Sequence, residues 1–203
     1  MWFPTVPSQR GSPDGLHLST HSGNTMGIHL DWILAGAQRT RGLTEKLLAG
    51  ISSSEAARKP RFEKNGAALV VDTNHPTFIM GHLSLYPSRV MINFGLDGAA
   101  AAAPDAWTEL LKAGAPCVDD VLGTLYPSLA VVSEQYFRAT DLCLAGLAKI
   151  DDAKLSEPPV DERMRTNFPT LGYAAVFMLN NHVMLHMGQL SAWRRCYGLP
   201  SAL

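Results

Sequence analysis

Two histidines stand four residues apart near the end of the chain, in the run Asn181-His182-Val183-Met184-Leu185-His186. On an α-helix, side chains at this spacing lie on one face, one turn apart, so both imidazoles can converge on a single point. A divalent metal ion is the simplest partner for such a pair. The alternative is a chance spacing in which each ring is a hydrogen-bonded histidine of the core.

A metal site of this kind needs a third ligand, because zinc and related ions prefer three or four. His82 follows Gly81 in the middle of an apolar run, and the glycine would allow another segment to approach closely. Facing helices of a bundle donate ligands across the core in this way. Three neutral imidazoles leave a coordination position open, as in catalytic metal sites. Val183 follows His182 where a zincin protease has Glu, so that class is excluded.

Three other residues could assist such a site, although no general base stands out and the catalytic residues stay unknown. Gln189 lies one turn further along the flank of His182 and could orient a ligand or substrate, or bond a neighbouring helix instead. His75 stands about 10 Å along a helix from His82, too far to share one ion. It would line the entrance or assist a helix start. His29 is a candidate substrate contact or, alternatively, an exposed histidine.

Helical spacing of apolar residues indicates the elements that must position these side chains. It predicts long helices over residues 28–50, 76–94, 127–150 and 171–197. No convincing alternating strands are present. We therefore expect an all-α four-helix bundle, with a long Gly/Ala-rich connection between helices two and three that could cover a site.

Local signals refine two of these helices. Thr73 or Asn74 would cap the second helix, with Pro76 in its first turn. Pro87 lies inside the same helix and predicts a kink. Arg194 and Arg195 lie near the end of the last helix. They could bind a carboxylate, or their positive charges could stabilise the helix C-terminus without any ligand.

Residues 1–27 are rich in Gly, Pro, Ser and Thr and have no apolar period, so they are expected to form an irregular leader. Residues 28–203 would then form the folded domain. The chain's 46% hydrophobic residues suffice for one sizeable core. Its three cysteines are odd in number and far apart, which argues against a disulfide framework and against a cysteine zinc site.

The charge balance limits the partners of the protein. Lys plus Arg number 17 against 18 Asp plus Glu, without the basic excess that nucleic acids or anionic membrane surfaces require. No stretch approaches the roughly 20 apolar residues that cross a bilayer, and the start lacks a signal-peptide pattern. We expect a cytoplasmic protein with a small-molecule substrate and no nucleic-acid or membrane partner, with a homodimer as one assembly that it could form.

The sequence resembles the DinB/YfiT-like superfamily of metal-binding four-helix proteins. The resemblance rests on Phe168-Pro169-Thr170-Leu171-Gly172, on Asn181-His182, on His186-Met187-Gly188-Gln189-Leu190-Ser191-Ala192-Trp193-Arg194-Arg195, and on Gly81-His82-Leu83 upstream. It is most specific over residues 168–200, and the helix order extends it over 28–200.

The resemblance implies that His82, His182 and His186 bind a divalent ion, zinc or nickel. It also implies a metal-dependent enzyme, a transferase that joins a low-molecular-weight thiol to a small electrophile, with a hydrolase as another possibility. Members of the family are frequently dimeric. The alternative is a non-catalytic metal-containing stress or binding protein.

Overall fold

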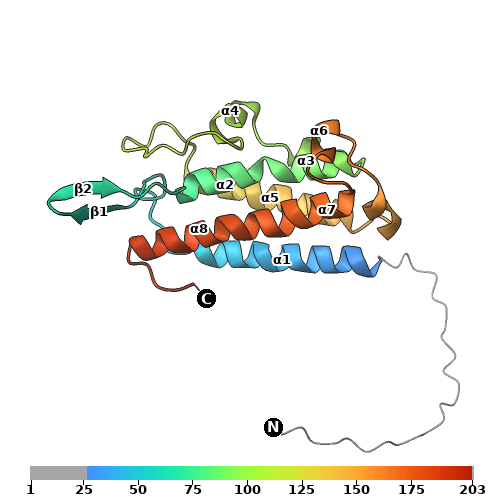
Figure 1. Ribbon diagram of the computed structural model, residues 1–203, viewed down its shortest axis with the longest axis horizontal. Helices are drawn as coiled ribbons and strands as arrows, with labels where there is room; N and C mark the ends of the chain where they lie inside the picture. Colours follow the sequence, from blue (N-terminus) through green and yellow to red (C-terminus); the bar gives the residue numbers. More distant parts are fainter. Residues whose placement is uncertain (1–26, 203) are drawn as a thin grey trace, which may run out of the picture.

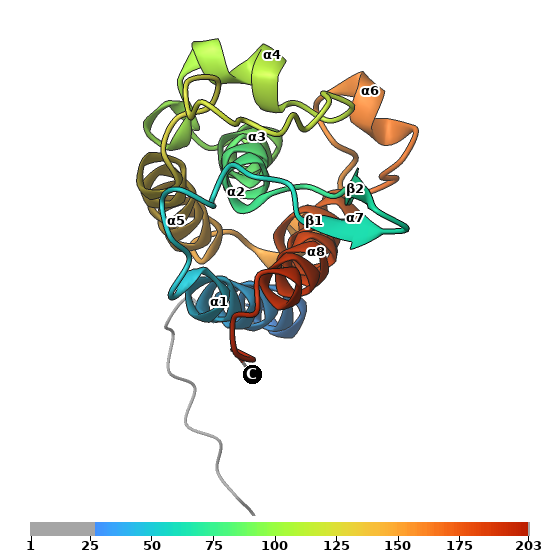
Figure 2. The same ribbon diagram turned by 90° about the vertical axis from the view of Figure 1, so that its left-hand side faces the viewer.

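The computed structural model describes residues 27–202. The leader expected before residue 28 therefore lies, apart from Gly27, outside the described residues. The long helical segments run side by side along one axis, as Figure 1 shows, and Figure 2 shows them from one end. They are α1 (Ile28–Leu48), α2 (Pro76–Ser84) continued by α3 (Tyr86–Asn93), α5 (Leu129–Leu147), and α7 (Leu171–Val176) continued by α8 (His182–Cys196). The expected all-α bundle is confirmed.

Short helices and one hairpin complete the described chain. Residues 94–128 connect α3 to α5 and include the short helices η1 (Ala99–Ala101), η2 (Asp105–Trp107) and α4 (Thr108–Leu111). Helices η3 (Asp152–Ser156) and α6 (Glu162–Arg165) lie between α5 and α7. Within residues 27–202, no helix combines the length and the apolarity needed to cross a membrane.

Two strands that the sequence analysis did not predict form an antiparallel hairpin, β1 (Arg61–Lys64) and β2 (Ala67–Val70). Phe62 pairs with Leu69, and the turn residues Asn65 and Gly66 have φ angles of 54° and 76°. An Asn-Gly turn with positive φ at both positions suits a two-residue hairpin. All residues of both strands are exposed, so no alternation of buried and exposed positions marked them as strands.

Proline breaks the second helical segment near the predicted point. α2 ends at Ser84, and Pro87 lies in the first turn of α3, where its missing N–H removes no helical hydrogen bond. The cap of α2 is His75 rather than Thr73 or Asn74, and its Nδ1 accepts a hydrogen bond from the Phe78 N–H.

The last helical segment contains a π-helical turn, η4 (Phe177–Asn181), directly before His182. Buried residues recur every four positions from Leu171 through Ala175, Leu179 and Val183 to Met187. In a regular α-helix, positions four apart drift by about 40° around the axis. The wider π turn compensates part of that drift and keeps these residues on the core side.

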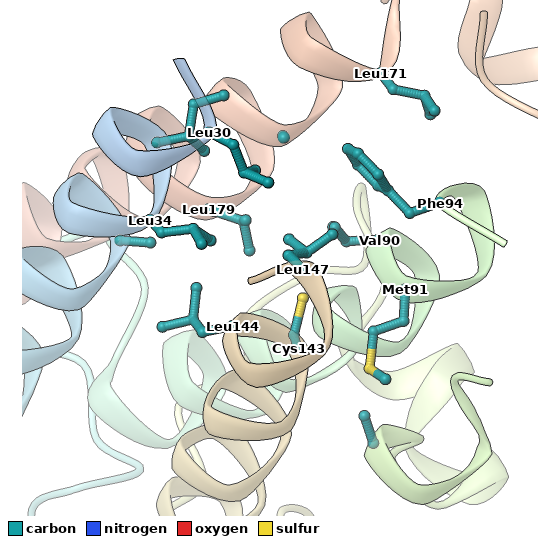
Figure 3. Packing of buried hydrophobic residues seen from close by; sticks show 14 of the residues in the cluster. Leu30, Leu34, Val90, Met91, Phe94, Cys143, Leu144, Leu147, Leu171 and Leu179 are labelled. Atoms are coloured by element: carbon teal, nitrogen blue, oxygen red, sulfur yellow. The ribbon is translucent and has the colours of Figure 1, made fainter. Parts of the chain in front are cut away.

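Two of the three apolar clusters formed by the described residues lie between the long helices of the bundle. Figure 3 shows the first, in which Leu30 and Leu34 of α1 lie near Leu179 of η4, with Val90 and Leu144 opposite. The second contains Ile79 and Leu83 of α2 and Val183 and Met187 of α8. The second cluster therefore joins the helices that carry the three histidines.

Candidate metal centre

The fold brings together the three histidines that the sequence analysis selected. His82 lies in the last turn of α2, His182 begins α8 after the π turn, and His186 follows one turn later. Each is buried, with 5%, 8% and 7% of its surface exposed. One ring nitrogen from each lies within 4.8 Å of the others, so the group could hold a metal ion.

The spacing of these nitrogens fits a common ion. His182 Nε2 lies 3.1 Å from His82 Nε2 and 3.0 Å from His186 Nε2. Two imidazole nitrogens, each about 2.0–2.1 Å from one ion, stand about 2.8–3.4 Å apart at tetrahedral or right-angle geometry. The observed separations fall in this range.

Hydrogen bonds on the far side of two rings direct their lone pairs inward. His82 Nδ1 lies 2.7 Å from the Leu111 carbonyl oxygen, and His186 Nδ1 lies 2.9 Å from Gln189 Oε1. Both Nδ1–H groups donate to these oxygens, which leaves each Nε2 with a free lone pair. The Nδ1 of His182 is buried without a hydrogen-bond partner among the described residues.

Burial keeps all three imidazoles neutral, which is the form that binds metals. Burial lowers the pKa of His82 to about 4, although its hydrogen bond to the Leu111 carbonyl opposes the shift. Burial lowers the pKa of His182 to about 3, and a proton on His186 or His82 would disfavour a second charge there. The pKa of His186 is also lowered by burial, while its hydrogen bond to Gln189 opposes this.

Three aromatic rings surround the histidines. Phe78 stacks on His82 with centroids 6.1 Å apart, and Phe177 of the π turn stacks on His182 at 5.6 Å. Tyr86 directs its hydroxyl to His82 Nε2 at 3.3 Å. The sequence analysis did not select Tyr86 as a functional residue. The feature of the sequence that could have identified Tyr86 is its spacing of four residues from His82, which places both on one face of a helix.

Gln189 contacts the site directly. Its Oε1 accepts hydrogen bonds from His186 Nδ1 and, at 3.2 Å, from Asn74 Nδ2. The amide thus hydrogen-bonds a histidine of the cluster and also Asn74 in the segment before α2.

The other two candidates lie apart from the cluster. His75 is fully buried, and its Nε2–H donates to the Val118 carbonyl at 3.1 Å while its Nδ1 caps α2. His29 is exposed and hydrogen-bonds Asp152 at 3.1 Å. Both His29 and Asp152 line a pocket of about 760 Å³, together with Phe177.

Comparison with known protein families gives a match to this chain. The model of the DinB superfamily matches residues 37–190, a range that contains the three clustered histidines and Gln189. No curated protein and no solved structure matches the chain.

Proposed function

Since the chain belongs to the DinB superfamily, we propose that it is a metal-dependent enzyme in which His82, His182 and His186 bind one divalent ion. The observation that carries the proposal is the convergence of three buried Nε2 atoms, two of them with lone pairs directed inward by hydrogen bonds at Nδ1. The donor set fits zinc and nickel, both of which accept imidazole nitrogen.

An alternative without metal satisfies these nitrogens less well. If His182 Nε2 carries a proton, it has acceptors at 3.0 and 3.1 Å and can donate well to only one of them. Its Nδ1 lone pair would then be buried without a partner. An ion instead uses all three inward lone pairs, which favours the metal site.

The chemistry proposed for the site is transfer of a low-molecular-weight thiol to a small electrophile. A divalent ion with three protein ligands keeps a position open, and its charge lowers the pKa of a thiol or a water bound there. The protein holds the imidazoles neutral and surrounds them with Phe78 and Phe177, which limits the access of bulk water.

A non-catalytic metal-containing protein is the second candidate. The burial of all three histidines favours it, because structural metal sites are closed. Turnover of thiols and electrophiles, with and without a chelator, separates the two candidates. An enzyme loses turnover on chelation while its fold persists. A structural site shows no turnover and a large fall in melting temperature.

Metal content tests the ligand assignment. We expect His186→Ala to lose stoichiometric zinc or nickel, measured by plasma emission spectroscopy, with its helical circular dichroism largely retained. Two imidazoles rarely form a tight site, which is the reason for the expected loss.

His29→Ala is the matched control, because His29 is exposed and lies outside the cluster. It should keep the metal content of the wild-type chain. Full metal occupancy in His186→Ala would show that the assignment is wrong.

A further inference from the structure

The Tyr86 hydroxyl is the polar group that faces the histidine cluster from the surrounding aromatic rings. Tyr86 is 9% exposed, and its ring centroid lies 4.7 Å from that of His182. Phe78 and Phe177, which stack on His82 and His182, carry no polar side-chain atom. A ligand that completes the site would therefore meet one hydroxyl among apolar rings.

Metal binding removes the present hydrogen-bond partner of this hydroxyl. His82 Nδ1–H donates to the Leu111 carbonyl, so His82 Nε2 is the acceptor and the Tyr86 O–H is the donor. An ion bound by His82 Nε2 uses the same lone pair. The hydroxyl stays buried and needs a new acceptor, because a buried donor without a partner is unfavourable. A ligand with an accepting atom next to the ion would supply it.

Arg89 places a positive charge beside the same tyrosine. Its guanidinium carbon lies 5.5 Å from the centroid of the Tyr86 ring, and its side chain is exposed. No carboxylate within residues 27–202 forms an ion pair with it. This positive charge therefore lies beside the ring whose hydroxyl faces the histidines.

We propose that Tyr86 and Arg89 select the ligand of the metal centre, and that this ligand carries a carboxylate. The Tyr86 hydroxyl donates to the ligand atom that occupies the open position, and the Arg89 guanidinium pairs with the carboxylate. The inference rests on the proposed metal site but not on thiol chemistry, since the carboxylate could belong to the thiol or to its co-substrate.

Calorimetric titration of the metal-loaded full chain tests the inference with three probes: 3-mercaptopropionate, 2-mercaptoethanol and acetate. We expect the wild type to bind 3-mercaptopropionate about three- to tenfold more tightly than 2-mercaptoethanol, a modest ratio because Arg89 is exposed. Arg89→Gln should abolish this preference and leave 2-mercaptoethanol binding unchanged. Tyr86→Phe should weaken both thiols about five- to tenfold. Metal content should be unchanged in both variants.

Arg195→Gln and Tyr173→Phe are matched controls, because both side chains are exposed and lie outside the cluster. Both controls should bind the probes as the wild type does. A carboxylate preference that survives Arg89→Gln, or thiol binding unchanged in Tyr86→Phe, would overturn the inference.

The acetate arm separates this inference from the thiol function. If neither thiol binds but acetate binds and weakens in both variants, the thiol chemistry fails and the inference stands. If 3-mercaptopropionate binds no better than 2-mercaptoethanol and acetate does not bind, the inference fails while the thiol chemistry stands. A chain that binds no metal contradicts both.

Discussion

At the scale of single residues, Gln189 determines which nitrogen of His186 carries the proton. Its Oε1 accepts from both His186 Nδ1 and Asn74 Nδ2, at 2.9 and 3.2 Å. Because Asn74 donates to the same oxygen, the amide keeps its carbonyl towards the histidine. The Nε2 lone pair of His186 is thereby directed to the centre of the cluster.

Removing this amide should weaken metal binding without removing a ligand. We expect Gln189→Leu to lower the affinity for zinc about ten- to hundredfold, measured by competition with a chromophoric chelator. Gln38→Leu is the control, since Gln38 is exposed on α1. Equal affinities in the two variants would show that His186 needs no such partner.

Residue types and spacing predicted part of this site. The spacing of His182 and His186 and the apolar surroundings of His82 indicated the cluster, and the position of Gln189 indicated an orienting role. The Leu111 carbonyl that accepts from His82 could not be predicted, because every residue has a main-chain carbonyl and the residue type does not show which one will accept. Tyr86 was missed because a buried tyrosine is usually a packing residue.

At the scale of elements, Gly81 allows α4 to approach α2. A Cβ atom at Gly81 would lie 2.6 Å from Leu111 Cδ1, and Leu111 is fully buried. The close approach that the sequence analysis expected from this glycine therefore occurs. It also brings the Leu111 carbonyl to His82.

We expect Gly81→Ala to destabilise the protein by about 1–3 kcal/mol, because the buried Leu111 has little room to move. Urea unfolding would measure the change, and metal affinity should fall with it. Gly188→Ala in α8 is the control, since its Cβ would meet nothing within 4 Å. That variant should gain up to about 1 kcal/mol from helix propensity. Equal effects at the two glycines would contradict the role given to Gly81.

The start of α2 should make stability depend on pH. Burial lowers the pKa of His75 to about 4, below the ordinary value of 6.5. Between pH 6.5 and 4 the unfolded chain therefore binds a proton that the folded chain does not, and stability falls as the pH falls through this window.

Replacing His75 should remove that contribution. We expect His75→Asn to take up about one proton less on unfolding near pH 5 than the wild type, measured from the pH dependence of urea unfolding. Asn can still cap α2 by accepting from the Phe78 N–H. An unchanged slope would mean that His75 is protonated in the folded protein.

At the scale of the whole molecule, Arg194 joins the end of α8 to the end of α1. Its guanidinium donates to the carbonyl oxygens of Leu47 and Ala49 at 2.8 and 2.6 Å, and to that of Pro200 at 3.1 Å. Of the two roles considered from the sequence, the structure shows it binding carbonyl oxygens at a helix C-terminus, here that of the neighbouring helix.

Arg194→Leu should cost about 2–3 kcal/mol of unfolding free energy, because it leaves the buried Leu47 carbonyl without its donor and removes the part-buried hydrogen bonds to Ala49 and Pro200. Thermal and urea unfolding would both report the loss. Arg195→Leu, at an exposed neighbouring position, should stay within about 0.5 kcal/mol of the wild type. A small effect at Arg194 would show that water replaces the guanidinium.

The sequence by itself determined the long helices, the proline break before α3, the family, and the three histidines that converge. Helical periodicity and a spacing of four residues act over one or two turns, so they can be inferred locally. The partners Leu111, Asn74 and Val118, and the approach of Tyr86 and Phe177 to the histidines, were decided only by the tertiary structure. These contacts depend on how separate helices and connections pack against one another, and that packing is set by interactions distributed over the whole core.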